Sequence, residues 1–347
     1  VERFAMDRAA LAAHPGAGRM TPEHSDAEIV VARLGNPQGA GRSLILQGHV
    51  DVVPPGPAAQ WTHPPFAARI VGDWLHGRGS GDMKAGCIAN LACLDALRRA
   101  GFGPDGPVML QSVVEEESTG NGALMTHLRG LRADTVLIPE PEDERLVRAN
   151  VGVLWFRVTV SGMPVHVREM QAGRDAIGMA FTMMAALRGL AEEWNGRAAE
   201  HRWFRDGPPP INLNIGRIAG GDWPSSVAGS CSFDARIAIL PGTPAAEAAA
   251  EIETCLARAA RAAGVASNAL PQVDWTGFFA EGYVLEEGSQ AEAVLGEAHA
   301  QATGAALETF NTFGYLDTRV HALYDKVPAL AYGPLAGIAA LPGEDWQ

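Results

Sequence analysis

Four short segments of the chain carry acidic or histidine side chains that could act together. The candidates are His49 with Asp51 in the sequence GHVD, Asp82 in a glycine-rich run, the adjacent carboxylates Glu115–Glu117, and Glu140 between two prolines. Histidine nitrogens and carboxylate oxygens are ligands that divalent metal ions take in proteins. Three adjacent carboxylates repel one another, and a cation would relieve that repulsion by binding one and leaving its neighbour as a base. The four segments together predict a metal site.

Three of the segments also have a simpler explanation when they are taken alone. A His-x-Asp pair is commonly structural, Asp82 could be the N-cap of the helix that follows it, and a run of glutamates is usually a solvated surface. In the functional interpretation, Asp51 fixes the tautomer of His49, and Asp82 could bridge two cations through its two oxygens. The N-cap explanation leaves the dense glycines around Asp82 without a purpose, and Glu115–Glu117 directly follow an apolar strand. The presence of all four segments, in this order and at strand ends, favours a functional site.

The elements that would position these side chains are typical of a parallel α/β unit. Apolar runs predict buried strands over Ser43–Gln47, Val108–Val114 and Thr135–Ile138. Helical spacing predicts a helix over Met83–Ala100, which stops at Gly101. This alternation of strand, helix and strand favours an α/β layer architecture. The candidate acids follow the strands, at the carboxyl ends where ligands of open α/β sheets bind.

The middle of the chain is typical of a different architecture. A strand, a helix, two strands and a second helix are predicted over Val153–Val160, Asp175–Trp194, Ile211–Ile218, Ser230–Leu240 and Pro244–Ala263. This order predicts a small α+β domain with an antiparallel sheet and helices on one face.

From about Val273 the pattern returns to the first type, with a helix over Ser289–Thr303 and a strand over Ala329–Tyr332. We therefore predict an α/β fold of two domains. Residues 1–152 and 272–347 would form a catalytic metal-binding domain with a mixed, mostly parallel sheet flanked by helices, and residues 153–271 an inserted domain.

Composition limits the class of partner. The 347 residues carry a net charge of -13, and the basic residues form no cluster. This charge argues against nucleic acid and anionic membrane surfaces as partners. No apolar run approaches the roughly 20 residues that a membrane span needs. The four cysteines lie far apart without a CxxC pair, which predicts free thiols in a reducing cytoplasm.

At this point the motifs resemble those of the M20-type metallopeptidases and deacylases, of the acetylornithine deacetylase and succinyl-diaminopimelate desuccinylase type. The matching segments are GHVDVVPPG, GRGSGDMKAG, EEESTGNGA and IPEP, in order and at similar spacing over nearly the whole chain. The resemblance implies that His49, Asp82 and Glu140 hold one zinc ion. It also implies that Asp82 bridges to a second zinc bound by Glu117, and that Glu116 is the general base.

The resemblance further implies two zinc ions per subunit, with cobalt or manganese as alternatives, and a cis peptide bond between Asp82 and Met83. It gives the inserted domain the role of a lid and dimerisation domain in a homodimer. His166, in SGMPVH, would stabilise the oxyanion from the partner subunit, although a surface histidine at a strand end is the alternative.

Two further residues have roles by resemblance. Arg236, in Asp234-Ala235-Arg236, would grip a carboxylate of the substrate, a task that suits a planar fork of donors; a surface ion pair is the alternative. Ser226 lies in Gly220–Val227, which matches a substrate-contacting turn.

One position departs from the family pattern. The family closes its second zinc site with a late histidine that three residues separate from a glutamate, and here Ala340 and Glu344 stand at those positions. A methyl group cannot bind zinc, so either the second site is disabled or this branch works with one metal. The nearest remaining histidine, His321, lies in a context that resembles a structural turn.

The sequence therefore predicts a zinc-dependent amidohydrolase that removes an acyl group from an N-acyl amino acid or a related small amide with a carboxylate. One alternative is a dipeptidase or carboxypeptidase that uses the same cations on a peptide bond. The other is a catalytically impaired homologue that binds a small ligand, because Ala340 replaces the expected histidine.

Overall fold

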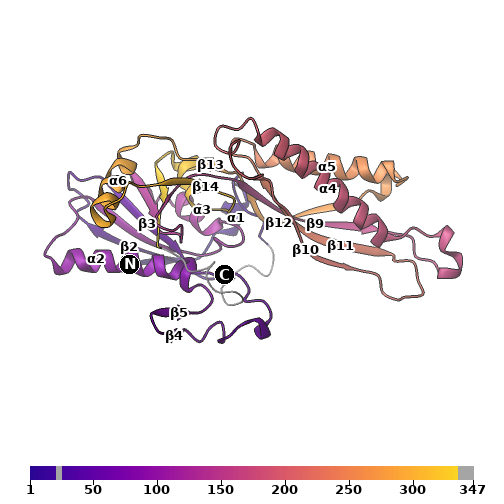
Figure 1. Cartoon of the computed structure of the whole chain (residues 1–347), viewed down its shortest axis with the longest axis horizontal. Helices are drawn as coiled ribbons and strands as arrows, with labels where there is room; N and C mark the ends of the chain where they lie inside the picture. The colour runs from indigo at the N-terminus through magenta and orange to yellow at the C-terminus, as the bar shows by residue number, and fades with distance from the viewer. Residues whose placement is uncertain (21–25, 335–347) are drawn as a thin grey trace.

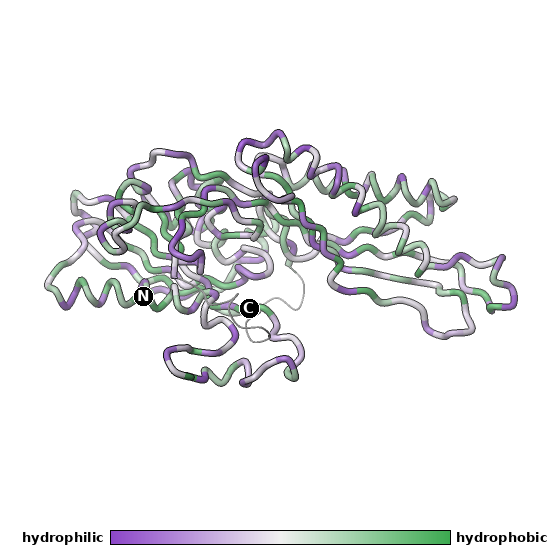
Figure 2. The backbone as a smooth tube through the Cα atoms, in the orientation of Figure 1, coloured by the Kyte–Doolittle hydropathy of each residue, from purple (hydrophilic) through white to green (hydrophobic). Residues whose placement is uncertain are grey.

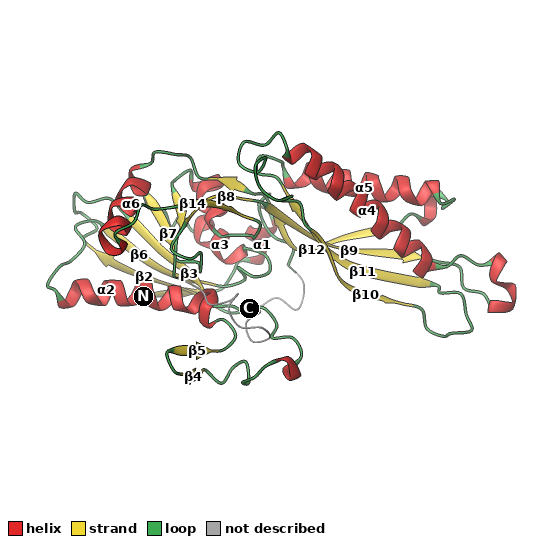
Figure 3. Cartoon of the chain, viewed as in Figure 1, coloured by secondary structure: helices red, strands yellow, loops and turns green. Residues whose placement is uncertain are grey.

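The computed structural model of the chain describes residues 1–20 and 26–334. The described residues form two halves, each built on its own sheet (Figure 1, Figure 3). We call residues 152–280 the four-stranded half and the rest the six-stranded half.

The six-stranded half is centred on a mostly parallel sheet in the order β1-β2-β6-β3-β7-β15. Strands β6, β3, β7 and β15 run parallel, and β1 and β2 form an antiparallel edge. In chain order the strands span Glu2–Phe4, Ile29–Gly35, Leu44–His49, Pro107–Val113, Thr135–Ile138 and Ala329–Ala331. The three strands predicted before residue 140 are thus present, in neighbouring positions.

Apolar side chains of these strands lie in a buried core. Ile45, Val113, Val136 and Ile138 are buried with Leu124 in one core cluster, and Figure 2 shows the apolar residues gathered along these strands. The helices of this half are α1 (Arg8–Ala12), α2 (Gly86–Arg99), α3 (Asn121–Leu128), α6 (Gln290–Thr303) and α7 (Thr318–Val320).

The predicted helix over 83–100 starts later than expected. A π-helical turn, η2 (Ser80–Ala85), precedes α2, and inside it Asp82 and Met83 leave helical backbone angles. The peptide bond between Asp82 and Met83 is cis. Helical spacing in the sequence cannot reveal this break, because the break sits between two segments that are both helical.

The four-stranded half is an antiparallel sheet covered by two helices. The strand order is β10-β11-β9-β12, and α4 and α5 lie together over the sheet on the same face (Figure 1). The bounds are β9 Gly152–Ser161, α4 Ala176–Ala198, β10 Leu213–Gly220, β11 Ser230–Ile239, α5 Ala245–Ala262 and β12 Gln272–Ala280.

Strand β12 lies beyond the boundary that the sequence predicted between residues 271 and 272. It pairs antiparallel with β9, so the four-stranded half continues to Ala280. The register of this pairing shifts between Trp275 and Phe279. The bulge disrupts the alternation of apolar and polar residues, which is the pattern by which a strand is recognised from sequence.

The two crossings between the halves lie next to each other. The chain enters the four-stranded half at Gly152 and leaves it after Ala280. A Cβ atom on Gly152 would lie 2.4 Å from the carbonyl oxygen of Ala280 and 2.5 Å from the nitrogen of Gly282. Glycine at position 152 therefore permits a backbone contact that a larger residue would prevent.

Two small sheets complete the fold. Strands β8 (Leu146–Asn150), β13 (Tyr283–Val284) and β14 (Thr309–Thr312) form one of them. Strands β4 (Arg69–Val71) and β5 (Trp74–His76) form a hairpin that projects from the six-stranded half (Figure 1). Over residues 1–20 and 26–334, no helix has the length and apolar content to cross a membrane.

Candidate metal and catalytic centre

His49 is the last residue of β3, and its side chain is 1% exposed. Its Nδ1 atom lies 3.0 Å from the carbonyl oxygen of Asp51, and its Nε2 atom lies 2.9 Å from Oδ1 of Asp82. A backbone carbonyl can only accept, so Nδ1 donates to it, and Nε2, which faces Oδ1 of Asp82, is the nitrogen that a cation could bind once it is deprotonated. This is the tautomer that a metal-binding histidine needs.

Asp51 also anchors the segment that carries the adjacent glutamates. Its Oδ1 accepts from the backbone nitrogen of Glu116 at 3.3 Å, and its Oδ2 accepts from that of Glu117 at 3.1 Å. The Asp51 carboxylate is 3.4 Å from Nδ1 of His49, so the carbonyl is the closer partner of the ring. Asp51 therefore orients His49 mainly through its backbone and the glutamates through its side chain.

The turn after β6 directs the glutamates toward the same place. Glu115 has a φ of 64°, a left-handed conformation that is uncommon for a residue with a side chain. Its carbonyl oxygen accepts from the backbone nitrogens of Thr119 and Gly120, which holds this conformation. Glu116 and Glu117 then both line one pocket.

Glu140 follows β7, the neighbour of β3 in the sheet. Its Oε2 lies 3.9 Å from Nε2 of His49, and one oxygen of Glu116 lies at the same distance. The other carboxylate oxygen of Glu140, Oε1, is buried and has no hydrogen-bond donor among the described residues. Burying a carboxylate oxygen without a hydrogen-bond donor costs free energy unless a cation binds that oxygen.

Burial and mutual repulsion perturb the acids of this cluster. Burial raises the pKa of Glu116 and Glu140 well above the usual value. Burial, followed by the charge of Asp82, raises the pKa of Glu117 to about 7. Burial opposes a charge on His49, but Glu140 and the other surrounding acids outweigh it and raise the pKa of His49.

The donor set fits a divalent cation. Ligand atoms of His49, Asp82 and Glu117 all lie within 4.8 Å of one another. The resemblance placed His49, Asp82 and Glu140 on one ion and Glu117 on a second ion that Asp82 also binds. Among the described residues, the group with mutually close ligand atoms contains Glu117, while Oε2 of Glu140 lies 3.9 Å from Nε2 of His49. The crowded acids and the unpartnered Oε1 of Glu140 are what a bound cation would neutralise.

The acid cluster opens into a cavity of about 370 Å³ between the two halves. Its charged lining consists of Asp82, Glu116, Glu117, Glu140, Glu142 and Arg236. Its apolar lining consists of Val53, Pro141, Val153, Trp155, Phe278 and Leu316, next to Tyr315 and Gly314.

Arg236 brings a positive charge from the four-stranded half into this cavity. One of its nitrogens, Nη2, donates to the carbonyl oxygen of Phe313 at 2.9 Å. Over the described residues, its guanidinium forms no ion pair; the neighbouring Asp234 pairs with Arg157. Burial lowers the pKa of Arg236. An arginine in a cavity whose remaining guanidinium N–H groups are free to donate can bind a carboxylate through two parallel hydrogen bonds.

His166 and Ser226 do not line this cavity. They pair with each other through the backbone in the four-stranded half, where His166 is exposed. Its Nδ1 accepts from the backbone nitrogen of Arg168 at 3.2 Å, and its ring meets Trp223 edge-on at 6.1 Å.

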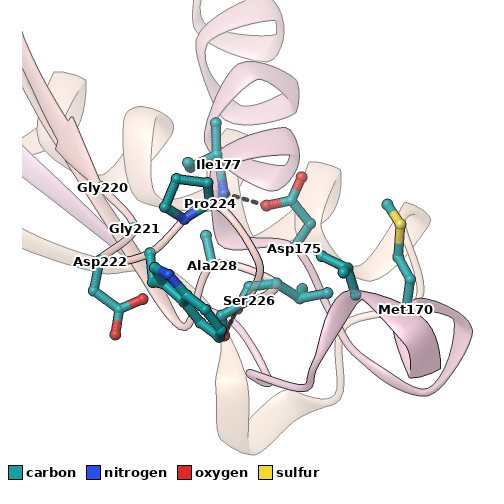
Figure 4. Close-up of a pocket in the computed structure, with 12 residues that line it drawn as sticks. Met170, Asp175, Ile177, Gly220, Gly221, Asp222, Pro224, Ser226 and Ala228 are labelled. Carbon is teal, nitrogen blue, oxygen red and sulfur yellow. Dashed lines mark hydrogen bonds between the residues drawn. The ribbon is translucent and has the colours of Figure 1, made fainter.

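Ser226 borders a separate hollow of about 550 Å³ that Figure 4 shows. Met170, Ile177, Pro224 and the turn at Gly220 and Gly221 surround this hollow, and Asp175 turns back to cap the start of α4 (Figure 4). Within one chain, Arg236 thus lines the same cavity as the acid cluster, whereas His166 and Ser226 lie outside that cavity.

Several cavity residues were not found from the sequence. Glu142, whose pKa burial raises to about 7, directly follows the IPEP segment but was not singled out. The aromatic residues Trp155, Phe278 and Tyr315 belong to no motif. Position 340 and Glu344 lie outside the described residues. Both ring nitrogens of His321 have partners, Asp325 and Gln47, as expected for a structural histidine.

A histidine and carboxylates gathered at the carboxyl ends of parallel strands, beside a buried glutamate in a cavity, form the kind of site that metal-dependent hydrolases use. The sequence model of peptidase family M20/M25/M40 matches residues 45–325. The chain belongs to this family of metal-dependent hydrolases.

Two curated relatives support the same family. The chain is 26% identical over 329 residues to an N-formyl-4-amino-5-aminomethyl-2-methylpyrimidine deformylase of Halalkalibacterium halodurans, covering 89% of this chain and 76% of the relative. It is 36% identical over 185 residues to a succinyl-diaminopimelate desuccinylase of Methylorubrum populi, covering 50% of this chain and 46% of the relative. The match to this desuccinylase thus spans about half of either chain.

Solved structures share the fold. An M20 family metallo-carboxypeptidase of Sulfolobus solfataricus matches with a TM-score of 0.70 at 15% identity, over 94% of this chain and 85% of the other. The dipeptidase Dug1p of Saccharomyces cerevisiae matches with a TM-score of 0.72 at 13% identity, over 96% and 80%. At these identities the likeness concerns the fold alone.

Proposed function

We propose that this protein is a cation-dependent amide hydrolase that removes an acyl group from an N-acyl amino acid or a related small amide. The observation that carries the proposal is one cavity lined by both the acid cluster and Arg236, with His49 behind it in contact with Asp82. Such a cavity offers an amide-cleaving site and a carboxylate-binding site at once. The relatives named as a deformylase and a desuccinylase support acyl removal.

The proposed cation ligands are His49, Asp82, Glu117 and Glu140. We expect zinc in two sites per subunit, with cobalt or manganese as alternatives. Because Ala340 stands where the family has a histidine ligand, this position affects whether the second site binds its ion. When bound, such cations supply Lewis acidity and lower the pKa of water to about 7. Asp51 holds His49 and the backbone of the glutamates in place for this.

The protein's own groups would move the proton and hold the substrate. Glu116 takes the proton of the attacking water and returns it to the leaving amine; burial raises the pKa of this carboxylate, which suits it to hold that proton. Arg236 pairs with the substrate carboxylate. Ser226 is proposed to contact the substrate when the halves close.

His166 would donate a hydrogen bond to the oxyanion from the partner subunit of a homodimer. Its exposure, and its absence from the cavity of its own chain, support this arrangement. The four-stranded half would then be an inserted lid and dimerisation domain. Mixing the inactive variants His166→Ala and Glu116→Gln tests it: heterodimers regain one intact site and part of the activity, whereas no recovery would place His166 in its own subunit's site or in none.

A substrate panel tests the reaction itself. The cation-loaded protein should hydrolyse N-formyl, N-acetyl or N-succinyl amino acids faster than dipeptides. A preference for dipeptides would make it a dipeptidase or carboxypeptidase with the same centre. If neither class is cleaved, Ala340→His separates a disabled enzyme, which gains activity, from a small-ligand-binding homologue, which does not.

The cellular site of action is part of the proposal. The four cysteines Cys87, Cys93, Cys231 and Cys255 are all free thiols, which supports a reducing compartment, the cytoplasm.

A further inference from the structure

A chain of buried hydrogen bonds runs behind the cavity, from Tyr315 to Asp325. The hydroxyl of Tyr315 donates to Oδ1 of Asp317 at 3.0 Å, and Nε2 of Gln47 donates to Oδ2 of Asp317 at 3.1 Å. Oε1 of Gln47 lies 2.8 Å from Nε2 of His321. Nδ1 of His321 lies 2.9 Å from Oδ2 of Asp325. Gln47, Asp317 and His321 are completely or almost completely buried.

Gln47 ties the strand of the metal centre to the segment 315–325. It lies on β3 two residues before His49, so both side chains leave the strand on the same side. Its amide donates to a carboxylate and accepts from an imidazole, and the neutral side chains of Asn and Gln offer both functions at fixed positions. Gln47 therefore fixes where the Asp317 carboxylate stands relative to β3.

Asp317 in turn fixes the ring of Tyr315, which forms part of the cavity wall. The ring centre lies 4.4 Å from that of Phe278, and both rings line the cavity beside Arg236. The hydroxyl occupies space left free at Gly120, where a Cβ atom would lie 1.8 Å from it. Since Gly120 has a φ of 70°, a side chain there would also be strained. The ring is thus held from its hydroxyl end.

We propose that Tyr315 is a specificity-determining residue, that Gln47 and Asp317 are positioning residues for its ring, and that the substrate presents an apolar or aromatic side chain to this wall. The inference rests on the proposed function and names its substrate class: an N-acyl amino acid with an apolar side chain. Trp155, Phe278, Tyr315 and Leu316 form an apolar wall beside Arg236. Apolar groups bind such walls because both surfaces leave water.

A purely structural role for Gln47 makes a different prediction. If its amide only joined β3 to the segment 315–325, its loss would lower the stability and affect all substrates alike. A positioning role instead changes the ratio between a large and a small substrate, because only the large one reaches Tyr315. The ratio of kcat/KM values therefore separates the two roles.

The experiment compares hydrolysis of N-acetyl-L-phenylalanine and N-acetyl-L-alanine by the cation-loaded protein. Tyr315→Ala removes the ring and should lower the preference for the phenylalanine substrate at least about tenfold, mainly through KM. Gln47→Met keeps the size of the side chain and removes both amide hydrogen bonds; it should lower the same preference about fivefold. The matched control is Tyr332→Phe, which removes one hydroxyl contact, with His299, outside the cavity; its preference should not change.

An unchanged preference in Tyr315→Ala would overturn the specificity role. An unchanged preference in Gln47→Met, with a lowered urea midpoint, would overturn the positioning role. If Gln47→Met does not fold, Gln47→Glu replaces it, because it keeps an acceptor for His321 and sets a carboxylate against Asp317. The expected and overturning results are then the same.

The failure of the proposed function would be visible separately. If the unaltered protein hydrolyses neither substrate, the proposed reaction fails for acetyl compounds. Calorimetric binding of the same two compounds then tests the apolar wall without any hydrolysis. The same loss of preference in binding would support the inference. Equal binding of both compounds by the unaltered protein, or binding of neither, would overturn it.

Discussion

Replacing Asp325 by Asn should destabilise the protein by about 3 kcal/mol at neutral pH. The Asp325 side chain is 1% exposed. Its Oδ1 lies 2.6 Å from Nδ1 of His127 and 3.0 Å from Nε of Arg132, and its Oδ2 lies 2.9 Å from Nδ1 of His321. Breaking a buried charge pair costs about 3–5 kcal/mol. We take the lower end because Arg132 is half-exposed and solvent screens its share.

The same change should alter how stability depends on pH. Burial opposes the ionisation of Asp325, but hydrogen bonds from His321 and His127 outweigh it and hold the pKa of this carboxyl below its usual value. A carboxyl with a lowered folded-state pKa stabilises the fold above its unfolded pKa of about 3.9 and loses that contribution as the pH falls through the folded value. The stability difference between the two proteins should be large at about pH 6 and shrink below about pH 4.

Urea unfolding followed by tryptophan fluorescence measures both effects. The control is Asp95→Asn on α2, which removes an exposed ion pair with Arg98 and Arg99 and should change the midpoint little. A loss below about 1 kcal/mol in Asp325→Asn, or a loss that is the same at about pH 6 and about pH 3.5, would refute the reasoning.

Three further outcomes concern the centre and the cavity. Arg236→Met should raise KM about 10- to 100-fold for substrates with a free carboxylate, since a hydrogen bond to a charged group is worth about 1.5–3 kcal/mol; steady-state kinetics with the matching methyl ester, which should respond little, is the control. Removing cations with a chelator should lower the unfolding temperature, and zinc at about 100 times its Kd should restore about 2.7 kcal/mol of stability. Calorimetry should show no such gain in Asp82→Ala, and an equal gain there would contradict the assigned site. His166→Ala should lower kcat about 100- to 1,000-fold with an unchanged unfolding temperature; undiminished turnover would remove His166 from the mechanism.

The sequence was most informative where a pattern repeats or a motif is dense. The parallel strands and α4, α5 and α6 were predicted close to their bounds, because apolar periodicity reports burial directly. The acids at strand ends were expected to meet, and His49 does lie within 4 Å of oxygens of Asp82 and Glu140. Parallel strands force this convergence, since their carboxyl ends share one edge of the sheet.

The sequence was least informative where the structure depends on contacts between distant segments. The bulged strand β12 was missed because alternation breaks between Trp275 and Phe279. The Tyr315 wall and its support by Gln47 depend on pairs more than 260 positions apart along the chain, such as Gln47 with Asp317. Neither a period nor a motif marks such a pair, so only the folded chain reveals it.

The adjacent crossings at Gly152 and Gly282 have a consequence for the history and engineering of the molecule. The two ends of the four-stranded half lie close together where they join the six-stranded half, and inserted domains are tolerated where chain ends are close. A short peptide could therefore close the gap left by excising the insert, with the parallel strands uncut. Exchange of that module between relatives would carry Arg236 with it, and so transfer carboxylate recognition while the cation ligands stay behind.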